Sequence, residues 1–153
     1  MKKIIVTYDG SEPAKRAVEG AKSLQGCYDC DVVLYSIIED ISTGFASHIK
    51  TDSDSRYMKE SRQKQKEELD KIYTWLQKVA DAFPNPDKVV TRVEMGKIGP
   101  QIVDHAEKEG CDCIVVGSRD IGPFKKLFKG SVSDYVSANA KCSVFIVRDI
   151  EDL

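Results

Sequence analysis

Apolar residues in this chain gather in five short runs that alternate with longer stretches of helical periodicity. The runs are rich in β-branched residues, and most are nearly unbroken, which is typical of strands buried on both faces of a parallel sheet. They span residues 2–9, 31–38, 88–94, 111–118 and 142–148. The run at 88–94, KVVTRVE, mixes polar residues among the apolar ones, so we expect it at an edge of the sheet.

Two helices are predicted between the first three runs. Small apolar residues recur at helical spacing from Ala14 to Leu24, behind Ser11 as an N-cap and Pro13 in the first turn. A long helix is predicted within 56–83, because Leu69, Ile72, Leu76 and Val79 form one apolar stripe before PNP at 84–86. Its polar first half, RYMKESRQKQKEE, is expected to project past the sheet.

Two further helices follow in the second half of the chain. One is predicted to start near Pro100, with Ile102, Val103 and Ala106 facing inward, and to end at Gly110. The other is predicted to start at Ser131, which stands at capping-box spacing from Asp134.

This alternation of strands and helices predicts an α/β fold, a three-layer doubly wound parallel sheet of five strands with helices on both faces. We expect one domain over residues 1–153. Residues 39–55 form an irregular stretch too long for an ordinary connection. It is either a lid or partner surface, or simple disorder.

Composition narrows the classes of partner. The formal net charge is -2, with 31% charged and 41% hydrophobic residues, which disfavours nucleic acid as a partner. No apolar run is long enough for a signal peptide or a membrane span. Five cysteines, an odd number, favour reduced thiols over a disulfide framework. A cytoplasmic protein is therefore expected.

The segment VVGSRDIGPFKKLFKGSVSDYV, residues 115–136, carries the clearest chemistry. It runs from a strand end, where parallel sheets bind ligands, to a helix start, where free N–H groups attract anions. Gly117 permits close backbone approach, and Gly130 and Ser131 suit a phosphate site. Lys125, Lys126 and Lys129 either add positive potential or form a solvated loop face. Neither a Walker A loop nor a G-x-G-x-x-G motif is present.

Over nearly its whole length the chain resembles the universal stress proteins. The resemblance rests on IIVTYDGSEPAKRAV, GKIGPQIVDHAEKEGCDCIVVGSRD and FKGSVSDYVSANAKCSVFIVR. The nucleotide-binding branch of that family carries G-x2-G-x9-G-[ST] in the loop quoted above. Here the spacing is kept from Gly117 to Gly130 and Ser131, but Asp120 replaces the second glycine.

The resemblance implies a Rossmann-like, adenine-nucleotide-binding sheet of strand order 3-2-1-4-5, with ATP as ligand, with or without Mg²⁺. By this resemblance, Thr7, Tyr8 and Asp9 face the adenosine, and Ile37 meets adenine with its backbone. The other implied site residues line the ribose and phosphate path: Gly117, Arg119, Asp120, Gly130, Ser131, Val132 and Ser133.

Asp120 is the departure from the family pattern. A carboxylate pointing inward would repel phosphate, whereas one pointing outward would pair with Arg119 or Lys125 or hold a divalent ion. We expect binding that is retained but weakened. Because the other branch of the family lacks the glycines and holds no ATP, a nucleotide-free protein is the alternative.

Other chemistry-bearing residues are interpreted as structural. Cys27, Cys30, Cys111 and Cys113 have spacings compatible with zinc, but we interpret them as thiols at the amino-terminal edge of the sheet, Cys113 in the core. His48 and His105 are interpreted as surface residues. Trp75 and Tyr73 are interpreted as core residues of the long helix rather than a binding platform.

No catalytic residues are identified, because no nucleophile stands beside a base in a recognised motif. The sequence therefore predicts an ATP-binding universal stress protein that acts in nucleotide-dependent stress signalling through an unidentified protein partner. The alternatives are a slow ATPase and a nucleotide-free interaction protein. A homodimer is expected through the last strand, 142–148, which is apolar and would otherwise leave a free edge.

Overall fold

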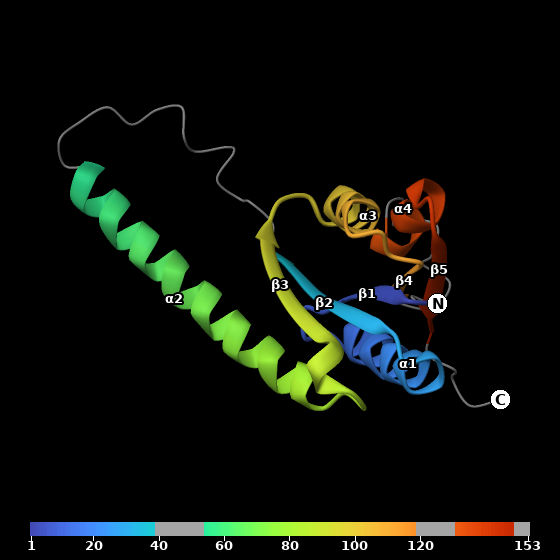
Figure 1. The fold of residues 1–153 in the computed structure, drawn as a ribbon. Coiled ribbons are helices and arrows are strands. Elements are labelled where there is room, and N and C mark those ends of the chain that lie inside the picture. The colour runs from blue at the N-terminus through green and yellow to red at the C-terminus, as the bar shows by residue number, and fades with distance from the viewer. Residues whose placement is uncertain (39–53, 119–130, 149–153) are drawn as a thin grey trace.

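The computed structural model describes residues 1–38, 54–118 and 131–148, and these form an α/β sandwich (Figure 1). The predicted fold class is confirmed. The strands are β1 (Lys3–Thr7), β2 (Asp31–Ile38), β3 (Val89–Met95), β4 (Cys113–Gly117) and β5 (Ser143–Val147). The helices are α1 (Glu12–Tyr28), α2 (Asp54–Asp81), α3 (Ile98–Lys108) and α4 (Val132–Asn139), with a 3₁₀ turn, η2, at Pro86–Lys88.

All strand pairs of the sheet are parallel, and their order is β3-β2-β1-β4-β5. The order confirms that the third strand is an edge strand. The chain adds strands to one side of β1 first and to the other side afterwards, so the topology reverses between β1 and β4. In doubly wound sheets the crevice at such a reversal, beyond the carboxyl ends of the strands, is where ligands bind.

Alternate residues of β1 pack into two separate cores. Ile4 and Val6 pack with Ala17 of α1 and Leu76 of α2, whereas Ile5 packs with Ile102 of α3 and Val136 of α4. Each face of the sheet is therefore covered by two helices, and the central strands are buried on both sides. All of these side chains are fully buried.

Helix α1 forms where its sequence predicts. The Ser11 hydroxyl accepts a hydrogen bond from the Ala14 N–H at 3.4 Å, and Pro13 lies in the first turn. The helix ends at Asp29, which adopts a left-handed conformation with φ of 51°. Near that end, the buried Gln25 side chain bonds both the N–H and the C=O of Asn85, which ties α1 to the segment before β3.

Helix α2 is attached to the sheet through its second half. Its fully buried side chains are Leu76 and Ala80, and Phe83 continues the contact just after the helix. The first half extends past the sheet, as predicted (Figure 1). The side chains of Lys59, Glu60 and Arg62 there are exposed. Tyr73, interpreted as a core residue, is 43% exposed instead, because it lies on the outer side of the helix.

Helix α3 differs from its prediction in two respects. It begins at Ile98, before the predicted start near Pro100, because proline is tolerated in a first helical turn. His105 is not a surface residue: it is 9% exposed and lies on the same side of α3 as the buried Ile102 and Ala106. Within the described residues, no helix combines the length and apolar character that a membrane span requires.

Candidate functional site

The carboxyl ends of β1 and β2 are uneven, because β2 continues beyond its pairing with β1. The paired register of the two strands ends at Thr7 and Tyr35, and one further bond joins the Tyr8 N–H to the Tyr35 C=O at 2.9 Å. Strand β2 continues beside β3 as far as Ile38, which pairs with Met95. Among the described residues, the last part of β2 therefore has no strand neighbour on its β1 side.

The backbone of Ile37 faces the β1 side of β2, beyond the end of the pairing. In a strand, the polar groups of successive residues point alternately to the two sides. The Tyr35 C=O faces β1, where it accepts from Tyr8, and the Ile38 C=O faces the β3 side, where it accepts from the Gly96 N–H at 3.0 Å. The N–H and C=O of Ile37 are therefore directed to the side that β1 has left, where a planar donor-acceptor edge can meet them.

The turn after β1 brings an exposed carboxylate to the same edge of the sheet. Thr7 is half-buried, Tyr8 is buried and Asp9 is exposed. One oxygen of Asp9, Oδ1, accepts a hydrogen bond from the Ser11 N–H at 2.9 Å, which fixes the turn ahead of α1. The turn also needs Gly10, whose φ of +79° is a conformation that other L-residues rarely adopt.

At the end of β4, Gly117 has a packing role that the sequence does not reveal. A Cβ on Gly117 would lie 2.0 Å from the backbone oxygen of Pro13, in the first turn of α1. The absence of a side chain therefore lets α1 pack against the sheet, whatever else this glycine does. The next residue, Ser118, continues the pairing with β5 by donating its N–H to the Val147 C=O at 2.9 Å.

The start of α4 presents the helix N-terminus predicted from the sequence. Ser131 is the N-cap, and its hydroxyl accepts from the Asp134 N–H at 3.1 Å. The hydroxyls of Ser131 and Ser133 lie 3.0 Å apart, with Ser133 buried. The first intrahelical backbone bond is made by the Tyr135 N–H to the Ser131 C=O at 3.0 Å. The amides of Val132 and Ser133 precede it and point along the helix axis, the arrangement that favours an anion at a helix N-terminus.

The structure thus brings two groups of predicted residues to the carboxyl edge of the sheet. Thr7, Tyr8, Asp9 and Ile37 lie at the ends of β1 and β2, and Gly117 lies at the end of β4. Ser131, Val132 and Ser133 begin α4, which leads into β5. The remaining predicted residues, Arg119, Asp120 and Gly130, lie outside the described residues, as do Lys125, Lys126 and Lys129, His48 and residues 39–53.

A partly buried polar cluster adjoins the site and was not predicted. The Tyr35 hydroxyl donates to Oε2 of Glu94 at 2.7 Å, and Nδ1 of His105 lies 3.3 Å from Oε1 of the same carboxylate. The rings of Tyr35 and His105 stack with centroids 4.5 Å apart. Burial, and then the bond to Glu94, raise the pKa of Tyr35 well above its usual range, so its hydroxyl stays a donor.

The cysteines do not form a candidate metal centre. All five are free thiols, and Cys30, Cys111 and Cys113 are buried whereas Cys27 is exposed. Burial raises the pKa of Cys111 to about 11, which disfavours the thiolate that zinc binds. Among the described residues, no three His, Cys, Asp or Glu side chains gather in a group able to hold a metal ion.

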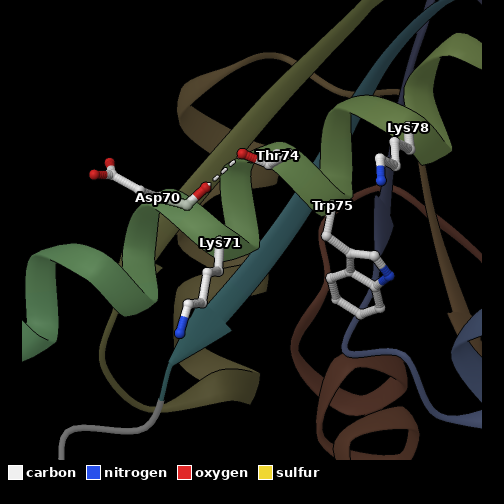
Figure 2. Close-up of a pocket in the computed structure, with 5 residues that line it drawn as sticks. All are labelled: Asp70, Lys71, Thr74, Trp75 and Lys78. Atoms are coloured by element: carbon white, nitrogen blue, oxygen red, sulfur yellow. Dashed lines mark hydrogen bonds between the residues drawn. The ribbon is translucent and has the colours of Figure 1, made fainter.

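A shallow groove of about 320 Å³ runs along one side of α2, beside the turn after β1. It is lined by Asp70, Lys71, Thr74, Trp75 and Lys78 (Figure 2). The Thr74 hydroxyl donates to the Asp70 C=O within the helix at 2.8 Å. Trp75 is half-buried and packs against the core, so its interpretation as a packing residue rather than an open platform agrees with the structure.

Comparison with known proteins identifies relatives over nearly the full chain. Residues 1–148 match the profile described as the Universal stress protein family. Universal stress protein MJ0531 of Methanocaldococcus jannaschii is 29% identical over 149 residues, which cover 96% of this chain and 82% of that protein. Universal stress protein YxiE of Bacillus subtilis is 26% identical over 148 residues, covering 95% of this chain and 98% of that one.

Solved structures share the fold. The hypothetical protein MJ0577 has a TM-score of 0.72 at 23% identity, covering 99% of this chain and 98% of that one. A universal stress protein in complex with cAMP has a TM-score of 0.66 at 19% identity, covering 95% of each chain. The Arabidopsis thaliana protein At3g01520, with AMP bound, has a TM-score of 0.58 at 18% identity, covering 99% of this chain and 94% of that one.

Proposed function

The chain belongs to the universal stress protein family, and from this we propose that it binds ATP, with or without Mg²⁺, as a signalling ligand in a stress response. The single observation that carries the proposal is the convergence of two complementary surfaces at the carboxyl edge of the sheet. One is the backbone edge of Ile37, which no described strand pairs with on the β1 side, together with Asp9 at the end of β1, and the other is the capped start of α4. An adenosine fits the first, and a phosphate chain fits the second.

Each surface suits one part of the nucleotide. A donor and an acceptor on the Ile37 backbone match the donor and acceptor on one edge of adenine, and the exposed Asp9 carboxylate suits ribose hydroxyls. The amides of Val132 and Ser133, with the Ser131 hydroxyl, suit phosphate oxygens. Gly117, Arg119, Asp120 and Gly130 complete the proposed ribose and phosphate path.

Relatives support the ligand class, and the loop spacing supports ATP within it. Structural neighbours with cAMP and with AMP bound show that this fold holds adenine nucleotides in other proteins. The glycine spacing from Gly117 to Gly130 and Ser131 is the feature that favours a longer phosphate chain. The five free thiols agree with the cytoplasmic location that we propose for such a protein.

The phosphate end can be tested without disturbing the fold. Asp and Asn both replace Ser well as an N-cap, but only Asp places a negative charge at the helix start. We therefore expect Ser131→Asp to fold normally and to bind Mg-ATP at least about tenfold more weakly, and Ser131→Asn, which loses the hydroxyl but adds no charge, to weaken binding much less.

Thermal stability with and without Mg-ATP measures this effect, since a ligand at a hundred times its Kd stabilises by about 2.7 kcal/mol. Wild-type protein that gains no stability from saturating Mg-ATP would contradict the proposal and favour a nucleotide-free interaction protein. Phosphate release in the same samples separates simple binding from slow hydrolysis.

We also propose that two copies pair through β5. This strand has β4 as its strand neighbour on one side, no described strand pairs with its other side, and its Phe145 is 44% exposed. A free, apolar edge strand is a template for antiparallel pairing. Light scattering at micromolar concentration is expected to give the mass of a dimer, and a Phe145→Lys variant the mass of a monomer. A wild-type monomer would rule the pairing out.

A further inference from the structure

Trp75, the chain's single tryptophan, lies directly on the turn that carries Asp9. It comes from α2, and its ring stacks on Tyr8 with centroids 4.5 Å apart and planes tilted by 38°. A Cβ on Gly10 would lie 2.6 Å from Cη2 and 2.7 Å from Cζ2 of the indole. The six-membered part of the indole therefore fills the space that Gly10 leaves by having no side chain.

These contacts hold both residues that flank Asp9. Tyr8 is fixed on one side by the Trp75 ring and along the sheet by its N–H bond to the Tyr35 C=O. Gly10 has a φ of +79° and lies under the same indole. Asp9, between them, keeps its own bond from the Ser11 N–H at 2.9 Å. The conformation of the turn between β1 and α1 thus depends on the indole of Trp75, which α2 supplies.

We propose that Trp75 is a positioning residue for the nucleoside end of the nucleotide site. It holds the Asp9 turn beside the Ile37 backbone, so that the carboxylate is already placed when the ligand arrives. This inference rests on the proposed function, because it assigns a role within the same site.

The inference makes different predictions for the nucleoside end and the phosphate end of the site. Trp75 contacts the turn after β1, whereas the phosphate end is built from the start of α4, which packs on the opposite face of the sheet. A change at Trp75 should therefore weaken adenosine and ATP together and leave binding of inorganic triphosphate alone unchanged. A general loss of stability would weaken all three ligands alike.

The position of Trp75 also makes its fluorescence suitable for detecting ligand binding. Its ring borders the groove shown in Figure 2, beside Lys71 and Lys78, and is half-buried. Because there is one tryptophan, all indole emission comes from this position. We expect adenosine and Mg-ATP to shift or quench the emission of the wild-type protein, and inorganic triphosphate to leave it unchanged.

The variant that tests this role is Trp75→Phe, which keeps an aromatic ring near Tyr8 and removes the indole atoms that cover Gly10. Its control is Tyr73→Phe, an equally mild change to an exposed ring on the same helix. By calorimetry, Trp75→Phe should bind ATP and adenosine about tenfold more weakly, the equivalent of one weakened hydrogen bond to a charged group, and Tyr73→Phe should not.

The outcomes separate this inference from the proposed function. If calorimetry shows that the wild type binds ATP while its emission is silent and Trp75→Phe binds equally well, the inference is wrong and the proposed function stands. Equal weakening of ATP and triphosphate by Trp75→Phe also overturns the inference, since it indicates general loosening. If no nucleotide binds the wild type, both are overturned.

Discussion

Replacing Gly117 by alanine is expected to destabilise the protein by about 3 kcal/mol or more, the upper range for an overpacked core. The new methyl group would lie 2.0 Å from the backbone oxygen of Pro13 and 2.4 Å from its carbonyl carbon. These are backbone atoms in the first turn of α1, so no side-chain rotation can relieve the clash. Either α1 or β4 would have to move, and both are central to one core. Urea unfolding measures the loss.

Gly26→Ala is the matched control for this prediction. Gly26 lies inside α1, and a Cβ there would meet no atom within 4 Å. Alanine is the better helix former, so this substitution should stabilise the protein by roughly 0.5–1 kcal/mol. If Gly117→Ala were as stable as the wild type, the close contact between β4 and α1 would not exist as described.

The packing of Gly117 changes how the glycine spacing of the loop is interpreted. A family resemblance assigns this residue to the ligand path, but the geometry requires glycine even with no ligand present. The ligand-specific part of the pattern therefore rests on the start of α4, where the hydroxyls of Ser131 and Ser133 lie 3.0 Å apart beside the first amides of the helix. For this reason the charge test at Ser131 is more informative about nucleotide binding than any substitution at Gly117.

The sequence predicts the layers of this fold well, because burial on two faces leaves a strong local pattern. β2 and β4 are continuous apolar runs in the sequence, and both are buried almost throughout. The N-caps are equally local, since Ser11 and Ser131 bond amides three residues away. Gly117 at a strand end and Ser131 at a helix start follow from the same local signals, whereas it is the family resemblance that assigns Thr7, Tyr8, Asp9 and Ile37 to the candidate site.

Features that depend on register could not be predicted in this way. Glu94 meets Tyr35 and His105 only because β3 pairs with β2, and α3 packs over them, in one particular register. One weak signal existed for His105, which stands three residues after the inward-facing Ile102 and so lies on the same side of the helix. Likewise, the contact of Trp75 with Gly10 joins helix α2 to the turn after β1, which is far from it in the chain.

Leu76→Ala is expected to destabilise the protein by about 2–5 kcal/mol, the range for deleting a large buried aliphatic side chain. Leu76 is fully buried and packs in the same core as Ile4 and Val6 of β1. Helix α2 has few such anchors, since its first half extends past the sheet. The loss should therefore be concentrated in α2, with faster amide hydrogen exchange there than in β1 or β4.

The same substitution tests how α2 is coupled to the candidate site. Trp75 precedes Leu76 on the helix, so loosening the anchor should also loosen the indole from Gly10 and expose it to water. We expect the tryptophan emission of Leu76→Ala to move to longer wavelength while the protein is still folded. Tyr73→Ala, at an exposed position on the same helix, should leave both exchange and emission nearly unchanged. Uniform destabilisation with unaltered emission would mean that α2 is not a separately anchored element, and that Trp75 is held by the turn rather than the turn by Trp75.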